Sequence, residues 1–402
     1  RADLYVQSFI NGTDWADEVK RIDNLGKISK QDVIEWACKY LADNNYAVVY
    51  KRQGEDRTVQ KVSAPKITPI KSNRDVQSAF LAEIQAVEVE PIEPVYADFE
   101  KDMSIFNVKG VDVLYAQNKI NDVTGITIEY NTGTESDPAL NLAFDYLSYL
   151  GTPTRSAEEI AQQMYQLACN FGLSSGSNRT FISIYGLSEN MPEAMAIVED
   201  LAYNAVPDEA ILANLKADMF KSRADAKLNQ GACFGQLQQY VLYGPEFIKK
   251  TTLTDKQIQS ITSEELLAKV RELLGCQHEI RYSGPASEKE VAKLIEENHI
   301  IAENLKPLEK AYTRYLPVDA SKVYLVQYDA KQIYYMQFSN RGEKLDLKAD
   351  PYVALYNEYF GGGMNAIVFQ EMREARGLAY SSSARLYQPT HKDDSYMYYA
   401  FI

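Results

Sequence analysis

Arg373 and Tyr380 lie seven positions apart near the end of the sequence and are suited to polarising a carbonyl group. Arginine is a permanent cation with N–H donors in a fixed geometry, and a phenol donates a hydrogen bond to a developing oxyanion. The alternative interpretation is structural, with the arginine in a solvated surface ion pair and the tyrosine in a sheet. The spacing alone does not choose between the two.

A helix that starts after three glycines is expected to position Arg373. Glycine gives the backbone freedom to turn, and a helix N-terminus leaves backbone N–H groups free. At about 100° per residue, Arg373 points nearly opposite the apolar face of this helix and stays out of the core. That apolar face is predicted to contain Met364, Ile367 and Val368, with Met372 at its margin.

The end of this helix and the element after it are also predicted. Gly377 suits the position just after a helix, and Arg376 beside it complements the helix dipole. Residues 378–380 then begin a predicted strand, which places Tyr380 on the strand that follows the helix of Arg373.

The stretch REARGLAY, after a helix that starts at glycines, resembles the Arg/Tyr motif of the non-catalytic half of pitrilysin/insulinase-type zinc metallopeptidases. The resemblance implies that Arg373 and Tyr380 hydrogen-bond the scissile carbonyl or its tetrahedral intermediate. It also implies that zinc is held by the N-terminal half or by a homologous catalytic subunit. Gly361, Gly362 and Gly363 are then expected to form a turn that lets a peptide or neighbouring domain approach, rather than an anion site at a helix N-terminus.

The same family carries H-x-x-E-H, shortly followed by Gly-Thr, in its catalytic half. Two imidazoles on one helical face bind zinc there, and the Glu activates water. Aligned on Gly151-Thr152, the corresponding positions of this sequence are Leu142, Asp145 and Tyr146. Leucine does not ligate zinc and tyrosine is a poor replacement for imidazole. We therefore expect no metal site in this chain, as in the inactive half of the family.

Histidines elsewhere offer no substitute site in the sequence. The three in the chain, His278, His299 and His391, are far apart, and none has a partner three or four positions away. Each is predicted to lie at the surface or at a strand end. Four scattered cysteines without C-x-x-C spacing are predicted to be buried free thiols, namely Cys38, Cys169, Cys233 and Cys276.

Composition restricts the classes of partner. The net charge of −14 argues against nucleic acid and against an anionic membrane surface, because both select basic patches. Such acidity could favour basic peptides, but it more often serves solubility. No apolar run approaches the roughly 18 residues of a membrane span. The family resemblance leads us to expect a peptide substrate and a bacterial periplasmic or cell-envelope location.

Two internal echoes indicate a repeated α+β architecture. Residues 22–50 resemble residues 255–282, and residues 137–151 resemble residues 350–363. We expect pitrilysin-like domains, each a mainly antiparallel sheet with helices packed on it, and we expect the first and last to be incomplete. The predicted division is 1–56 (tail of a preceding domain), 57–104 (Pro-punctuated linker), 105–305 (metal-free peptidase-like domain), 306–320 (connector) and 321–402 (truncated domain carrying the Arg/Tyr motif).

Two functions follow from these observations. In the first, the chain is the non-catalytic C-terminal part of a zinc metalloendopeptidase: it closes a peptide chamber and supplies Arg373 and Tyr380. In the second, it is a catalytically dead scaffold or peptide-binding protein of the same fold, similar to the core subunits of respiratory complexes. The sequence contains no G-x-x-x-x-G-K-[ST], G-x-S-x-G or Rossmann glycine pattern that would indicate a different chemistry.

Overall fold

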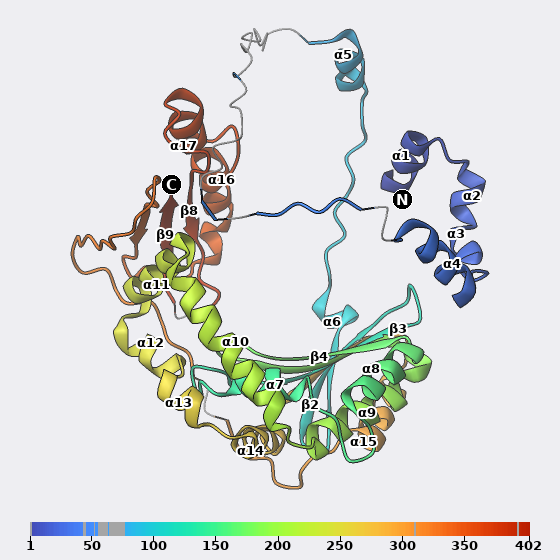
Figure 1. Ribbon diagram of the computed structural model, residues 1–402. Coiled ribbons are helices and arrows are strands. Elements are labelled where there is room, and N and C mark those ends of the chain that lie inside the picture. The colour runs from blue at the N-terminus through green and yellow to red at the C-terminus, as the bar shows by residue number, and fades with distance from the viewer. Residues whose placement is uncertain are drawn as a thin grey trace. The chain divides into compact units, whose positions relative to one another are not determined.

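The computed structural model describes residues 2–42, 46–51, 53–54, 63, 77–308, 311–391 and 394–402. The chain forms two compact units, Arg1–Ile92 and Glu93–Ile402 (Figure 1). Most of the predicted linker before residue 77 lies outside the described residues.

The first unit is helical where it is described. Its helices are α1 (Ala2–Asn11), α2 (Trp15–Val19), α3 (Arg21–Leu25), α4 (Lys30–Tyr40) and α5 (Ala79–Ala86). The N-terminus of α4 is set by a reciprocal capping box between Ser29 and Asp32. Residues 46–51 have the β-branched and aromatic composition of a strand, but among the described residues no strand pairs with them and they do not form one. Cys38 is exposed, which corrects the prediction that it is buried.

The second unit begins with a domain built on a six-stranded sheet. Its strands are β1 (Ser104–Val108), β2 (Val111–Gln117), β3 (Val123–Tyr130), β4 (Cys169–Ser175), β5 (Thr180–Leu187) and β6 (Glu279–Gly284). They lie in the order β1-β2-β6-β3-β5-β4, and every neighbouring pair is antiparallel except β2 and β6. The mainly antiparallel α+β fold predicted from the sequence is confirmed.

Helices cover one face of this sheet (Figure 1). Residues of β3 alternate, so that Ile126, Ile128 and Tyr130 enter the core with at most 3% of their surface exposed. The helices in this part of the chain are α6 (Phe99–Asp102), α7 (Leu140–Leu147), α8 (Ala157–Gln166), η1 (Ser188–Asn190), α9 (Met191–Asn204), α10 (Glu209–Lys227), α11 (Gln230–Tyr243), α12 (Pro245–Thr251), α13 (Asp255–Ser260), α14 (Ser263–Leu274) and α15 (Glu288–Asn298). Of these helices, α7, α8 and α9 pack against β4 and β5.

The end of the chain forms a second, three-stranded sheet. Its order is β7-β9-β8, and both pairs are antiparallel. Its strands and helices are β7 (Met336–Ser339), η2 (Leu347–Ala349), α16 (Asp350–Phe360), α17 (Ile367–Phe369), the π-helical segment η3 (Gln370–Ala375), β8 (Ser383–Tyr387) and β9 (Met397–Phe401). Residues 322–330 also have a strand-like pattern, but they pair with no strand in the described part of the chain.

The internal echoes correspond to equivalent elements. Both α7 and α16 begin at or just after an Asp-Pro pair, and both pack against an edge strand, β4 and β8 respectively. Both α4 and α14 begin with a capping box. Among the described helices, none is both long enough and apolar enough to cross a membrane.

Candidate functional site

Arg373 lies in η3, the π-helical continuation of α17. The helical backbone starts at Ile367, a few residues later than the glycines suggested, and the π-helical segment ends at Ala375. The Arg373 side chain keeps 33% of its surface exposed. Single π-turns in helices occur frequently at functional sites, because they change the direction of the side chains that follow.

Two aromatic rings hold the Arg373 guanidinium. Its Cζ atom lies 4.4 Å from the centroid of the Tyr380 ring and 4.8 Å from the centroid of the Phe369 ring. Both distances are within the range of a cation–π contact. A carboxylate of Glu374 is 3.6 Å from the Arg373 Nε. The structure thus brings Arg373 and Tyr380 together, with the guanidinium against the phenol ring.

Tyr380 lies in a bend before β8, which corrects its predicted place on a strand. Strand pairing with β9 begins only at Ser383. Gly377 ends the preceding helix in the left-handed conformation, with φ +58°, as predicted. Its N–H donates to the Arg373 carbonyl at 3.1 Å, and the Leu378 N–H donates to the Met372 carbonyl at 2.9 Å. This turn reverses the chain and leaves the Tyr380 side chain mostly exposed.

The predicted apolar face of the helix is wrong in detail. Met364 is 72% exposed and Ile367 is 38% exposed, whereas Ala366, at 2%, is the buried residue. The prediction assumed a regular helix from Met364 onward. The helix instead starts at Ile367 and widens to π spacing at Gln370, so the 3.6-residue period does not apply across this stretch.

The glycines before α17 allow the end of α16 to approach β8. A Cβ atom on Gly361 would lie 2.0 Å from the carbonyl oxygen of Ala384, and one on Gly362 would lie 2.7 Å from the carbonyl oxygen of Asn357. Gly363 has no such restriction, since its nearest neighbour would be 3.6 Å away. The close approach that the structure shows is therefore to this chain's own backbone.

The positions equivalent to a zinc site do not fit a metal. Leu142 is buried, at 3% exposure, and supplies no ligand atom. The Tyr146 hydroxyl accepts a hydrogen bond from the Asp208 N–H at 2.7 Å and lies 2.9 Å from the Ser263 hydroxyl oxygen. Tyr146 thus joins α7 to the starts of α10 and α14. Across the described part of the chain, no three His, Cys, Asp or Glu side chains gather in a way that could hold a metal ion.

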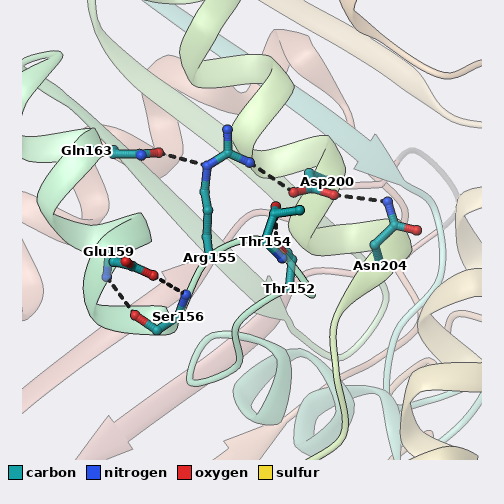
Figure 2. A network of polar contacts seen from close by, with 8 residues as sticks. All are labelled: Thr152, Thr154, Arg155, Ser156, Glu159, Gln163, Asp200 and Asn204. Carbon is teal, nitrogen blue, oxygen red and sulfur yellow. Dashed lines mark hydrogen bonds and ion pairs between the residues drawn. The ribbon is translucent and has the colours of Figure 1, made fainter.

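A polar network fixes the loop that follows α7 (Figure 2). Arg155 donates to Gln163 of α8 at 2.9 Å and to Asp200 of α9 at 3.1 Å. The backbone of Thr152 pairs with that of Arg155, and a capping box between Ser156 and Glu159 begins α8. The Gly151-Thr152 stretch thus has a structural role here, anchoring α7 to α8 and α9.

The prediction that each histidine lies at the surface or at a strand end is wrong for His299, which follows α15 and is buried; His278 does lie at a strand end, just before β6. His278 and His299 are buried, at 8% and 6% exposure, and their Nε2 atoms are 3.0 Å apart. Their separation of 21 residues follows no helical or strand period, so no sequence signal indicated the contact. Phe369 was also missed, although its i, i+4 spacing from Arg373 is the spacing of neighbours on one helical face.

A concavity of about 360 Å³ lies over the β7-β9-β8 sheet. Gln337, Ser339, Arg341, Glu343, Leu386, Tyr396 and Tyr398 line it. Neither Arg373 nor Tyr380 is among these residues, so within this chain the Arg/Tyr pair lies outside that concavity.

Comparisons with known proteins agree with the fold. No family model matches the sequence. An uncharacterised zinc protease of Rickettsia felis is 24% identical over 288 residues, covering 68% of this chain and 65% of that protein. Another from Rickettsia bellii is 24% identical over 251 residues, covering 59% of this chain and 57% of that protein. The chain therefore matches somewhat less than two thirds of the length of these relatives.

Solved structures show the same architecture. The peptidase M16 inactive domain of Pseudomonas fluorescens has a TM-score of 0.60 and 19% identity, covering 75% of this chain and 74% of that chain. The periplasmic protease PqqL of Escherichia coli has a TM-score of 0.63 and 15% identity, covering 95% of this chain but only 40% of that chain. The ferredoxin protease FusC, solved with Arabidopsis ferredoxin, has a TM-score of 0.62 and 10% identity, covering 100% of this chain and 46% of that chain.

Proposed function

We propose that this chain, a relative of pitrilysin-type zinc proteases with the fold of their inactive domain, completes a peptidase active site whose zinc is bound elsewhere. The main supporting observation is the Arg373 guanidinium, which contacts the rings of both Phe369 and Tyr380 and is still partly exposed. A cation that is already ordered and still accessible at the surface can bind a substrate with little rearrangement of its side chain.

Arg373 and Tyr380 act as hydrogen-bond donors in this proposal. When a peptide carbonyl is attacked, its oxygen gains negative charge, and guanidinium N–H groups and a phenol O–H can stabilise that charge. The Phe369 ring limits the rotamers of Arg373, so less conformational entropy is lost when a substrate binds. Phe369 is therefore a positioning residue, since it acts through Arg373.

Zinc belongs to another part of the enzyme in this proposal. Leu142 and Tyr146 cannot replace two imidazoles, and Tyr146 is already committed to α10 and α14. The partner is then a zinc-bearing N-terminal half or homologous subunit, with which the chain closes a chamber around a peptide. PqqL is named as periplasmic, and a periplasmic or cell-envelope location is proposed here by that likeness.

Peptidase turnover of the assembled enzyme tests these roles. Arg373→Ala should lower kcat/KM by on the order of 100-fold, the usual cost of losing an oxyanion donor. Tyr380→Phe keeps the ring and its contact with the guanidinium, so a loss in this variant reports the hydroxyl alone. Arg376→Ala is the matched control, because Arg376 is also near the end of η3 but pairs with Glu371. Unchanged turnover in the Arg373→Ala/Tyr380→Phe double variant would refute the proposal.

A peptide-binding scaffold without catalysis is the second candidate. The observation that favours it is the concavity over the three-stranded sheet, whose lining excludes the Arg/Tyr pair. Peptide binding that depends on Tyr398 or Arg341, in an assembly that shows no hydrolysis, would support it over the enzymatic role.

A further inference from the structure

Three polar side chains from distant parts of the sequence form a buried chain in the six-stranded domain. His278 lies just before β6, His299 follows α15, and Glu199 lies in α9. The two Nε2 atoms are 3.0 Å apart, and the His299 Nδ1 is 2.5 Å from the Glu199 Oε1. We refer to Glu199, His299 and His278 as the buried triad.

Hydrogen-bond accounting fixes how many protons the triad holds. The His278 Nδ1 is 2.8 Å from the Cys276 carbonyl oxygen, which only accepts, so this nitrogen carries a hydrogen. If His278 is neutral, its Nε2 is then an acceptor. The 3.0 Å contact is a hydrogen bond only if the His299 Nε2 donates.

The opposite end of His299 requires one more hydrogen. Its Nδ1 faces a carboxyl group, and a proton lies between them whether it belongs to the histidine or to Glu199. In either arrangement the triad binds one proton more than a carboxylate beside two neutral imidazoles.

A proton fits between the imidazoles better than a metal ion. Two imidazoles on one tetrahedral zinc, with bonds of about 2.0–2.1 Å, would have nitrogens roughly 3.3–3.4 Å apart. The observed 3.0 Å is the usual length of a hydrogen bond between nitrogens. A zinc site also needs further ligands, and none gather around the pair among the described residues.

Burial keeps the protons on the two tyrosines and the thiol that lie nearest the triad. Burial, with a contribution from Glu199, raises the pKa of Tyr203 to about 12. Burial also raises the pKa of Tyr130 on β3 and that of the Cys276 thiol, which Lys306 and Glu272 face. The next residue of α9, Asp200, is paired with Arg155 (Figure 2).

The triad lies beside residues 299–306, which leave α15 and lead into the predicted connector (306–320); we call residues 299–306 the start of the connector. The Tyr203 hydroxyl donates to the Ile300 carbonyl at 3.2 Å. The Gln277 N–H donates to the Lys306 carbonyl at 2.8 Å, and the Lys306 N–H donates to the Gly275 carbonyl at 3.0 Å. Residues 275–278 and 299–306 thus run side by side, with the two imidazoles bridging them.

We propose that the extra proton of the buried triad fastens the start of the connector to α9 and to the residues before β6, and makes this attachment sensitive to pH. Loss of the proton leaves one hydrogen on His299, so that either its Nε2 faces the His278 Nε2 lone pair, or its Nδ1 faces the Glu199 carboxylate, without a hydrogen between them. Gain of a second proton leaves two N–H groups and two positive charges facing each other. The triad is therefore fully hydrogen-bonded only at intermediate pH, and burial places the acid limit low by lowering the pKa of His278 to about 4.

Histidine-resolved ¹H–¹⁵N spectroscopy of the 402-residue chain tests the protonation directly. At pH 7 we expect His278 to carry its proton on Nδ1 and none on Nε2. We expect the His299 Nε2 to carry a proton that it donates to His278, and a second proton to lie between the His299 Nδ1 and Glu199. A His278 proton on Nε2 would overturn the proposal. So would one equivalent of Zn²⁺ binding at both imidazoles, because the space would then be a metal site.

Hydrogen exchange tests the pH dependence of this attachment. After correction for intrinsic rates, the Gln277 and Lys306 amides should exchange at least about 10-fold faster at pH 4 than at pH 6.5. His278→Phe, which removes the titrating imidazole, should remove this pH dependence, and His391→Gln, at a histidine outside the triad, should keep it. If the His278 variant does not fold, the wild-type protection profile decides. Equal protection at both pH values would refute the proposal.

Discussion

At the scale of single residues, the feature that matters is a cation with two aromatic neighbours. Arg373 could adopt many rotamers on an exposed helix, but its contacts with two aromatic rings restrict it. A cation–π contact contributes about 0.5–2 kcal/mol, depending on how far it is desolvated. This is enough to hold a donor in place without removing it from the surface.

Phe369→Leu should therefore reduce activity through Arg373. We expect kcat/KM of the assembled enzyme to fall by about 3- to 30-fold, which corresponds to the loss of one such contact. Phe369→Tyr, which keeps a ring, should retain most of the activity. If both variants are equally impaired, or if neither is, Phe369 does not position Arg373.

At the scale of elements, the approach of α16 to β8 sets the position of the Arg/Tyr motif. The Asn357 side chain donates to the Leu386 carbonyl at 2.9 Å and accepts from the Leu386 N–H at 2.7 Å. These bonds cover the outer edge of β8, and Gly361 lets the two backbones come together.

Gly361→Ala should destabilise the last domain. The new Cβ atom would overlap the Ala384 backbone, and forced overpacking typically costs about 1–3 kcal/mol. Gly363→Ala is the control, since its Cβ would make ordinary contacts and should change stability by less than about 0.5 kcal/mol. Urea unfolding measures both, and equal stability of the two variants would contradict the role of Gly361.

Helices were easier to predict from this sequence than strands, for a physical reason. The start of α4 depends on a capping box and α7 follows an Asp-Pro pair, and these signals are local. Strand limits depend on pairing, so β8 begins at Ser383 rather than at Leu378, where β9 offers no partner. Residues 46–51 and 322–330 have strand-like patterns but pair with no described strand.

The candidate site shows the same difference between local and long-range signals. A local motif indicated Arg373 and Tyr380, and the structure brings the two side chains together. The histidine pair joins residues that are brought together only by the packing of α9, α15 and β6, which no local pattern encodes.

At the scale of the whole molecule, the histidines give folding a dependence on pH. The pKa of His278 is lowered to about 4, first by burial, against about 6.5 in an unfolded chain. The unfolded state therefore binds more protons between these values, so stability is lost as the pH falls from 6.5 towards 4. The loss from His278 is at most about 3 kcal/mol. Thermal unfolding between pH 4 and 7 measures this loss. His278→Phe should lose less stability than the wild type as the pH falls, and an equal loss in the two proteins would contradict the role of His278.

Binding of a phosphinic peptide tests the central claim most directly, because its tetrahedral phosphinate resembles the attacked carbonyl. The assembled enzyme, wild type or Arg373→Ala, is titrated with this inhibitor and with a matching non-cleavable substrate peptide. We predict that Arg373→Ala weakens inhibitor binding by about 100-fold and peptide binding by less than about 3-fold. Equal affinities of the inhibitor for the two proteins would contradict a role for this chain in stabilising the intermediate.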